Sequence, residues 1–144
     1  ADLVAPLVVV SIAGRARRDP RTVLTEADLV AFEKRHGRIP RGSLVALHTG
    51  WQPRTGGADA AGFSGAAVRM LVAERAVVAI GTDTLSVDIR DATAAHTAIL
   101  GSGRYAVEAL ANLTAVPAVG ATVVVGAPRF AGGTGGPARV LALR

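Results

Sequence analysis

The sequence predicts a single α/β domain, residues 1–144, built around a mixed sheet. Short apolar stretches alternate along the chain with stretches of helical character, which is the pattern of α/β proteins. Residues 77–81 carry no polar side chain, as in a strand that is covered on both faces. The length is that of one ordinary domain, and half of the residues are hydrophobic. A single buried core is therefore expected.

The amino-terminal quarter of the chain predicts a strand, a loop and a helix. Residues 7–13 form a β-rich run that glycine ends. Residues 15–23 are basic and contain a proline, which is typical of a loop. A helix is predicted over 25–37 because Thr25 and Asp28 have the spacing of a capping box, and because a glycine follows a basic end.

The middle of the chain predicts a strand, a long loop, a helix and a second strand. Residues 44–49 form the strand, and residues 50–62 hold five glycines or prolines, so they are expected to be a loop near a ligand or an interface. A helix over 63–75 leads to the apolar strand 77–81. The polar residues 82–88 follow at the carboxyl end of that strand, where open α/β folds usually hold their ligands.

The remaining elements alternate in the same way. In chain order we predict a helix over 92–100, a strand over 104–108, a helical turn over 109–113, and two strands over 121–125 and 138–143 joined by the loop 128–137.

Composition excludes several classes of function. The chain has no cysteine, so a disulfide, a thiolate metal site and a cysteine nucleophile are impossible. The net charge is +5, but the basic cluster Arg15, Arg17, Arg18 and Arg21 has no interleaved aromatic residues that could stack on bases, so we expect no nucleic-acid partner. No apolar run reaches the roughly 18 residues of a membrane span, and residues 1–14 lack the basic start of a signal peptide. We therefore expect a cytoplasmic protein with no membrane contact.

The most informative pair of residues is His96 and Glu108, which are twelve positions apart. A helix carrying His96, a glycine turn and a returning strand ending at Glu108 would let both side chains reach one site. Glu108 lies among apolar residues, where a buried carboxylate needs a cation, an arginine or a proton. A metal ion would satisfy it, and so would an ion pair with one of the many arginines.

Four other residues are weaker candidates. His36 sits at the predicted end of a helix, where it complements the helix dipole, and we discard it as a ligand. His48 shares a strand face with Leu44 and Ala46, so it is either a half-buried histidine with one partner or a residue that supports the site. Asp83 and Asp88 are either turn-formers or caps, or they belong to a polar site that includes the hydroxyl group of Ser86.

Five short segments, taken together and in order, resemble one known family. They are Leu-Thr-Glu-Ala-Asp-Leu at 24–29, Leu-His-Thr-Gly-Trp at 47–51, Ile-Gly-Thr-Asp at 80–83 with Ser-Val-Asp at 86–88, the stretch 96–110, and Gly-Pro-Ala-Arg-Val at 136–140. The chain resembles the carboxyl-terminal part of the cyclase family of metal-dependent hydrolases, the group that includes bacterial kynurenine formamidases and isatin hydrolases.

The resemblance implies a fold, a cofactor and a reaction. The fold that it implies is a swivelling β/β/α-type domain, here without the family's amino-terminal part. It also implies a homo-oligomer that binds one or two divalent metals, usually zinc or manganese. The later histidine and glutamate of the family map onto His96 and Glu108. Glu108 would be a metal ligand, and His96 a ligand or a proton-transfer partner. Metal-activated water would hydrolyse the C–N bond of an aryl amide or lactam. Five other residues would support the metal or bind the substrate, namely His48, Trp51, Asp83, Ser86 and Asp88.

One family motif is absent. The principal metal motif, His-x-x-x-His-x-Asp followed closely by Pro-x-His, cannot occur here because the chain has only three histidines. We therefore expect most metal ligands to come from a segment absent from these residues, and we expect this chain alone to be inactive. The alternative is a non-catalytic oligomerising or ligand-binding domain on the same scaffold, with Glu108 paired to an arginine and the loop 50–62 at an interface.

Overall fold

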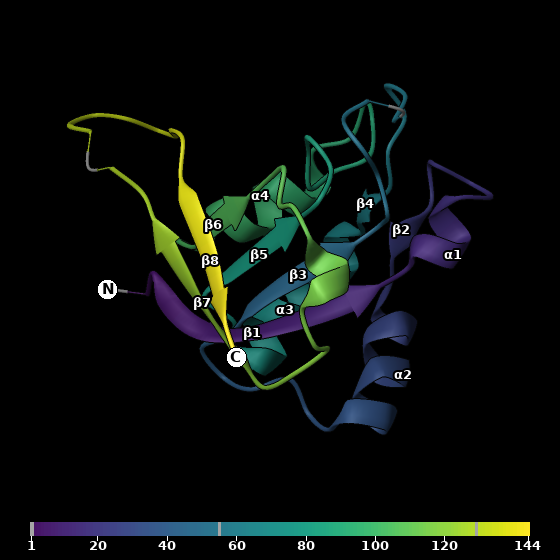
Figure 1. Ribbon diagram of the computed structural model, residues 1–144, viewed down its shortest axis with the longest axis horizontal. Helices are drawn as coiled ribbons and strands as arrows, with labels where there is room; N and C mark the ends of the chain where they lie inside the picture. The colour runs from purple at the N-terminus through teal and green to yellow at the C-terminus, as the bar shows by residue number, and fades with distance from the viewer. Residues whose placement is uncertain (1, 55, 129) are drawn as a thin grey trace.

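The centre of the molecule is a six-stranded mixed sheet with the order β6-β5-β3-β1-β7-β8 (Figure 1). The structure is a computed structural model that describes residues 2–54, 56–128 and 130–144. The strands are β1 (Val4–Ser11), β3 (Leu44–His48), β5 (Ala79–Thr82), β6 (Tyr105–Val107), β7 (Ala121–Gly126) and β8 (Arg139–Leu143). The strands β1, β3, β5 and β6 are parallel, whereas β7 is antiparallel to both of its neighbours. The predicted α/β class with a mixed sheet is confirmed.

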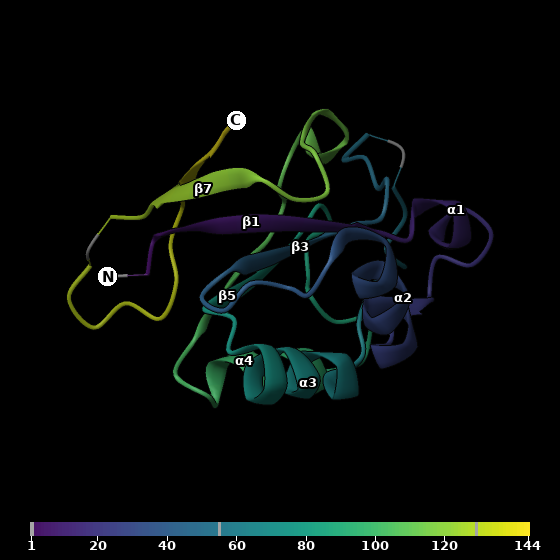
Figure 2. The ribbon, with the colours of Figure 1, turned by 90° about the horizontal axis from the view of Figure 1, so that it is seen from below.

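Helices cover one face of the sheet. The helices α2 (Glu26–His36), α3 (Gly65–Arg75) and α4 (Ala94–Leu100) lie on the same side, with α3 and α4 next to each other (Figure 2). Alternate residues of the strands face this layer and form one core cluster with it, including Val45, Leu71 and Ile80. Each fully buried aliphatic side chain of this kind stabilises the fold by about 1.5–3 kcal/mol.

The opposite face of the sheet has its own, smaller core cluster. The intervening residues of the strands, such as Leu7 and Leu44, pack there with Leu113 of the 3-10 helix η1 (Leu113–Ala115). In Figures 1 and 2 the η1 segment, drawn in green, lies over the face of the sheet away from α3 and α4. The sheet therefore separates two environments, and the site residues divide between them.

Two predicted segments differ from the structure. The strand predicted over 7–13 occupies Val4–Ser11 instead, and Ala13–Ala16, partly in the predicted loop, forms the short helix α1. The predicted loop 50–62 ends in β4 (Gly62–Phe63), which pairs with β2 (Val23–Leu24) in a second, two-stranded parallel sheet. Pairs of two residues show no periodicity in a sequence, because tertiary contacts alone bring them together.

The start of α2 follows the prediction closely. Thr25 Oγ1 accepts the backbone N–H of Asp28, and the Asp28 carboxylate accepts the N–H of Thr25, so the capping box is complete. Arg15 of α1 adds two hydrogen bonds to the same carboxylate, at 2.9 and 2.7 Å. These bonds, together with those from Thr25, lower the pKa of Asp28 to about 2. One member of the basic cluster is therefore a structural partner of α2.

The helices of the described part of the chain are all short. Within that part, none is long and apolar enough to cross a membrane.

Candidate functional site

The carboxyl edge of the sheet collects most of the polar residues that the sequence singled out. β1 and β3 end in register at Ser11 and His48, and β5 pairs with β3 on one side and with β6 on the other. Asp83 directly follows β5, and Glu108 directly follows β6. Because these strands are parallel, their carboxyl ends form one row, which is where ligands bind in open α/β sheets.

Asp88 positions both the start of α4 and the ring of His96. Its buried carboxylate accepts the N–H of Ala95 at 2.7 Å and the N–H of His96 at 2.9 Å. It thereby caps a helix whose N-cap residue, Thr93, makes no side-chain cap. The same carboxylate lies 2.7 Å from Nδ1 of His96. Ser86 supports it, because Ser86 Oγ accepts the N–H of Asp88.

His96 and Glu108 lie in direct contact. Nε2 of His96 is 3.2 Å from Oε1 of Glu108, which also accepts the backbone N–H of Val87 at 3.1 Å. The side chain of Glu108 is 36% exposed, so it is not the buried carboxylate that its apolar neighbours suggested, because it lies beyond the end of β6. Among the described residues, Glu108 makes no salt bridge with an arginine. The ion pair that the non-catalytic alternative requires is therefore not seen there.

The contact between His96 and Glu108 suits a cation. When Asp88 accepts the proton of Nδ1, a neutral imidazole turns the lone pair of Nε2 toward the Glu108 carboxylate. Two electron-rich atoms 3.2 Å apart repel each other unless a proton or a metal ion lies between them. Imidazole nitrogen and carboxylate oxygen are ligands of both zinc and manganese. The described residues contain no group of three or more His, Asp or Glu side chains that could hold a metal, so they offer this pair of donors.

The segment that carries Ser86 and Asp88 is held by a close backbone contact that the sequence did not reveal. A Cβ atom on Gly62 of β4 would lie 2.6 Å from the carbonyl oxygen of Val87 and 2.8 Å from the carbonyl carbon of Asp88. The adjacent Phe63 donates its N–H to the Val87 oxygen at 2.8 Å. Only glycine allows this approach, so β4 fixes the position of Asp88.

His48, Trp51 and Asp83 form a second group of site candidates. Nδ1 of His48 is 3.0 Å from Ser11 Oγ, and Nε2 is 4.0 Å from Oδ2 of Asp83. Asp83 accepts the N–H and Oγ1–H of Thr49 and the N–H of Gly50, so it anchors the turn after β3. The structure therefore confirms that Asp83 is a turn-former, whereas its role in a polar site stays a prediction. All three candidates line one cavity of 170 Å³.

The two groups lie on different sides of the sheet. His48 shares its strand face with Leu44 and Ala46, as predicted, and these two residues belong to the core cluster away from the helices. Glu108 contacts His96 on α4 and therefore lies on the helical side. The structure thus brings Ser86, Asp88, His96 and Glu108 together and places His48, Trp51 and Asp83 apart from them.

The chain after Glu108 forms a wall of the second group, and here the prediction of a helical turn over 109–113 was wrong. Ala109 and Asn112 have positive φ angles of 56° and 59°, so the chain turns sharply, and η1 begins only at Leu113. The N–H groups of Ala109 and Leu110 bond to the carbonyl oxygens of Thr84 and Thr82, which draws the segment across the end of β5. Asparagine tolerates the left-handed region of backbone angles, so Asn112 was the available sequence signal for this turn.

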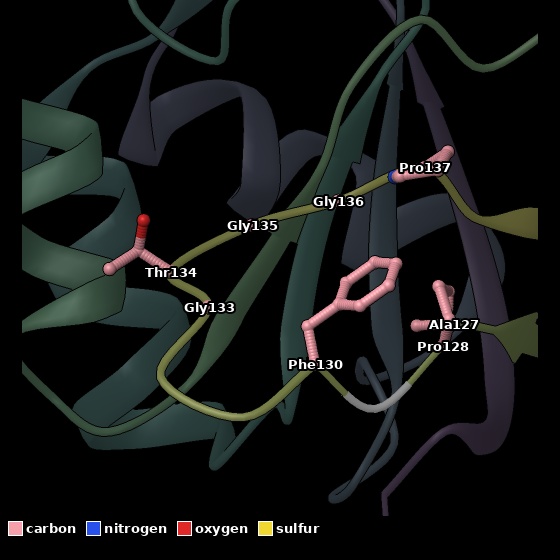
Figure 3. Close-up of a pocket in the computed structure, with 8 residues that line it drawn as sticks. All are labelled: Ala127, Pro128, Phe130, Gly133, Thr134, Gly135, Gly136 and Pro137. Atoms are coloured by element: carbon pink, nitrogen blue, oxygen red, sulfur yellow. The ribbon is translucent and has the colours of Figure 1, made fainter.

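A separate cavity lies inside the long connection between β7 and β8 (Figure 3). Its volume is 370 Å³, and its described lining consists of apolar residues, glycines and one threonine of the loop itself. The ring of Phe130 packs beside Gly136, where an added Cβ would be 3.1 Å from it. The sequence predicted a connecting loop here. No described residue of the lining can titrate or bind a metal, so we do not assign this cavity a catalytic role.

The chain is similar to known proteins of one family. The family described as "Putative cyclase" matches residues 1–89 of the chain. The isatin hydrolase of Roseibium aggregatum is 31% identical over 161 aligned positions, which cover 98% of this chain and 60% of that protein. The chain therefore spans about 60% of the length of this relative.

Two solved structures are similar over nearly the whole chain. Isatin hydrolase A from Labrenzia aggregata, bound to benzyl benzoate, superimposes with a TM-score of 0.89 at 29% identity, covering 98% of this chain and 61% of that one. An isatin hydrolase bound to the product analogue thioisatinate gives a TM-score of 0.91 at 27% identity, covering 98% and 60%. The resemblance noted from the five sequence segments is confirmed, and the chain belongs to the cyclase family.

Proposed function

We propose that this chain supplies His96 and Glu108 to the divalent metal site of a hydrolase that cleaves the C–N bond of an aryl or cyclic amide. The observation that carries the proposal is the contact of Nε2 of His96 with Oε1 of Glu108 at 3.2 Å, with Nδ1 held by the buried Asp88. A carboxylate that orients a histidine through its other nitrogen is the usual support of a metal-binding imidazole.

Each residue of this group has a distinct task. Asp88 keeps the proton on Nδ1, so that Nε2 of His96 is available as a ligand or as a proton-transfer group. The N–H of Val87 holds one oxygen of Glu108, which limits the freedom of the carboxylate. Ser86 and the capping bonds of α4 hold Asp88 itself. A bound zinc or manganese ion would lower the pKa of a coordinated water molecule and polarise the amide carbonyl group.

The proposed substrate is a small neutral amide or lactam. The named relatives are isatin hydrolases, and one of them is bound to a product analogue, thioisatinate. Two protein ligands are fewer than the three or four of an ordinary zinc site, so we propose that the other ligands come from polypeptide outside the described residues. The chain by itself is then expected not to hydrolyse amides. Amide hydrolysis by a preparation whose mass is that of the 144-residue chain would contradict this part of the proposal.

Replacing Glu108 with glutamine tests the metal role directly. Because an amide oxygen is a much poorer ligand than a carboxylate, E108Q should lose at least tenfold in zinc affinity. The measurement is a zinc titration followed by NMR of the imidazole protons, which resolves the chain's three histidines. The resonances of His96 should shift in the unmodified chain and not in the variant at the same zinc concentration.

The matched control is E26Q, which alters an exposed glutamate in the first turn of α2. It should bind zinc like the unmodified chain. If E108Q also binds zinc at His96 with unchanged affinity, Glu108 is not a ligand and the proposed site is wrong.

We also propose that the protein is a homo-oligomer that uses the outer edge of β8. This strand pairs with β7 on one side only and carries the exposed residues Leu141 and Leu143. An edge strand with apolar side chains can pair antiparallel with the same strand of a second copy, which gives a closed two-fold dimer. Light scattering should give a multiple of 14.6 kDa, and L141K should reduce that mass. A monomer at micromolar concentration would refute this proposal.

A further inference from the structure

The cavity bordered by His48 lies on the side of the sheet away from the helices. It lies between the carboxyl end of β3 and the turn that begins at Ala109, and its volume is 170 Å³. This space is sufficient for one aromatic ring with a small substituent. The cavity does not include His96 or Glu108 in its lining, so it is distinct from the proposed metal pair.

The ring of His48 lines this cavity and can present a hydrogen-bond donor to it. Ser11 Oγ lies 3.0 Å from Nδ1 of His48 and also accepts the N–H of Ala13 at 3.4 Å. In the tautomer in which the Ser11 hydroxyl donates to Nδ1, the neutral imidazole carries its proton on Nε2. Among the described residues, Nε2 has no hydrogen-bond partner, since the nearest carboxylate oxygen, on Asp83, is 4.0 Å away. The side chain of His48 is 17% exposed, so solvent reaches Nε2, and a ligand that fills the cavity would replace water as its hydrogen-bond partner.

The charge of Asp83 selects the kind of acceptor that fits. Its side chain is 8% exposed and lines the same cavity. Both of its oxygens already accept hydrogen bonds from Thr49 and Gly50, so the turn holds the carboxylate in place. A second carboxylate beside it would be repelled in this poorly solvated place. The acceptor that His48 meets is therefore a neutral carbonyl oxygen.

The other walls suit an aromatic ring. The indole of Trp51 is fixed, because its Nε1 donates to the carbonyl of Gly57 and the ring lies against Gly56, where no side chain would fit. Leu110 and Leu113 supply apolar surface from the turn. Aromatic pairs of this kind gain energy beyond the area that they bury. The left-handed residues of the turn concentrate backbone strain at this wall, as is common at ligand sites.

We propose that this cavity is a binding site for a neutral aryl carbonyl compound, with His48 Nε2–H donating to the carbonyl oxygen, Trp51 packing on the ring and Asp83 excluding the corresponding carboxylate. The choice of an amide as the ligand rests on the proposed function, whereas the cavity and its polarity do not.

Trp51 allows a direct test, because it is the only tryptophan of the chain. Benzamide and benzoate have nearly the same shape and differ in charge. With the chain kept in EDTA, titration with benzamide should change the Trp51 fluorescence to a plateau, and benzoate should need at least a tenfold higher concentration. Because EDTA removes metal, this result is independent of the ligand role of Glu108, and E108Q should bind benzamide normally.

Variants of His48 identify the donor. H48F should weaken benzamide binding by about three- to tenfold, the usual effect of one lost hydrogen bond. H48Q retains an N–H near the position of Nε2 and should bind benzamide within about threefold of the unmodified chain. The matched control is H36Q, at the exposed end of α2. The proposal fails if benzamide gives no saturable change, if benzoate binds equally well, or if H48F binds like H36Q. If H48F does not fold, H48Q and the benzoate comparison decide.

Discussion

Replacing Arg75 with leucine is expected to lower the free energy of unfolding by about 3–5 kcal/mol, the usual cost of removing one partner of a buried ion pair. The guanidinium of Arg75 on α3 donates to both oxygens of Glu33 on α2, at 2.7 and 2.9 Å. The two side chains are only 8% and 14% exposed. R75L leaves the carboxylate of Glu33 with the N–H of Ile39 as its remaining close donor.

The measurement is urea unfolding at pH 7, and the chain offers a control on the same helix. R69L removes an exposed arginine of α3 and should change stability by no more than about 0.5 kcal/mol. The double variant E33L/R75L should recover part of the loss, because two apolar groups replace two unpaired buried groups. Equal stability of R75L and R69L would show that the ion pair does not hold α2 against α3.

The ion pair of Glu33 and Arg75 also makes the stability of the fold fall as the pH is lowered. The hydrogen bonds from Arg75 lower the pKa of Glu33 below its ordinary value of 4.5. A group whose pKa is lower in the folded state stabilises the fold above its unfolded pKa and loses that contribution as pH falls through the folded pKa. Acid unfolding below pH 4.5 should therefore be less steep in E33L/R75L than in the unmodified chain.

Replacing Asp88 with asparagine is expected to disturb both stability and metal binding. The carboxylate accepts three donors, namely Ala95 N–H, His96 N–H and Nδ1 of His96. An amide of the same size can accept through one atom only, so at least one of these groups is left without a partner. We expect a loss of about 1–3 kcal/mol in stability. We also expect a fall of about 10- to 100-fold in zinc affinity, which is the usual effect of losing the carboxylate that orients a ligating histidine.

The control for this variant is D91N, three residues further on. Asp91 is exposed and has a positive φ angle of 65°, a conformation that asparagine also tolerates. D91N should resemble the unmodified chain in urea unfolding and in the zinc titration of the His96 resonances. A normal zinc affinity of D88N, in a variant that remains folded, would mean that Asp88 is a helix cap and does not orient His96 for a metal.

The sequence by itself determined the fold class, the main elements and the family. The capping box at Thr25 and Asp28, and the apolar run that includes β5, are local patterns whose physical causes lie within a few residues, so they could be predicted. The spacing of His96 and Glu108 allowed a contact without requiring one, and the structure shows that contact.

Only the tertiary structure decided how the candidate residues divide. His48 meets Asp83 because β3 and β5, which are distant in the sequence, pair side by side. Asp88 meets His96 because the loop after β5 folds back onto the start of α4. The close backbone contact at Gly62 and the left-handed turn at Ala109 likewise depend on backbone segments that meet only in the folded chain. A linear pattern records which chemical groups are present. The side of the sheet on which each group lies follows from long-range strand pairing and from packing of the helices, which no local pattern contains.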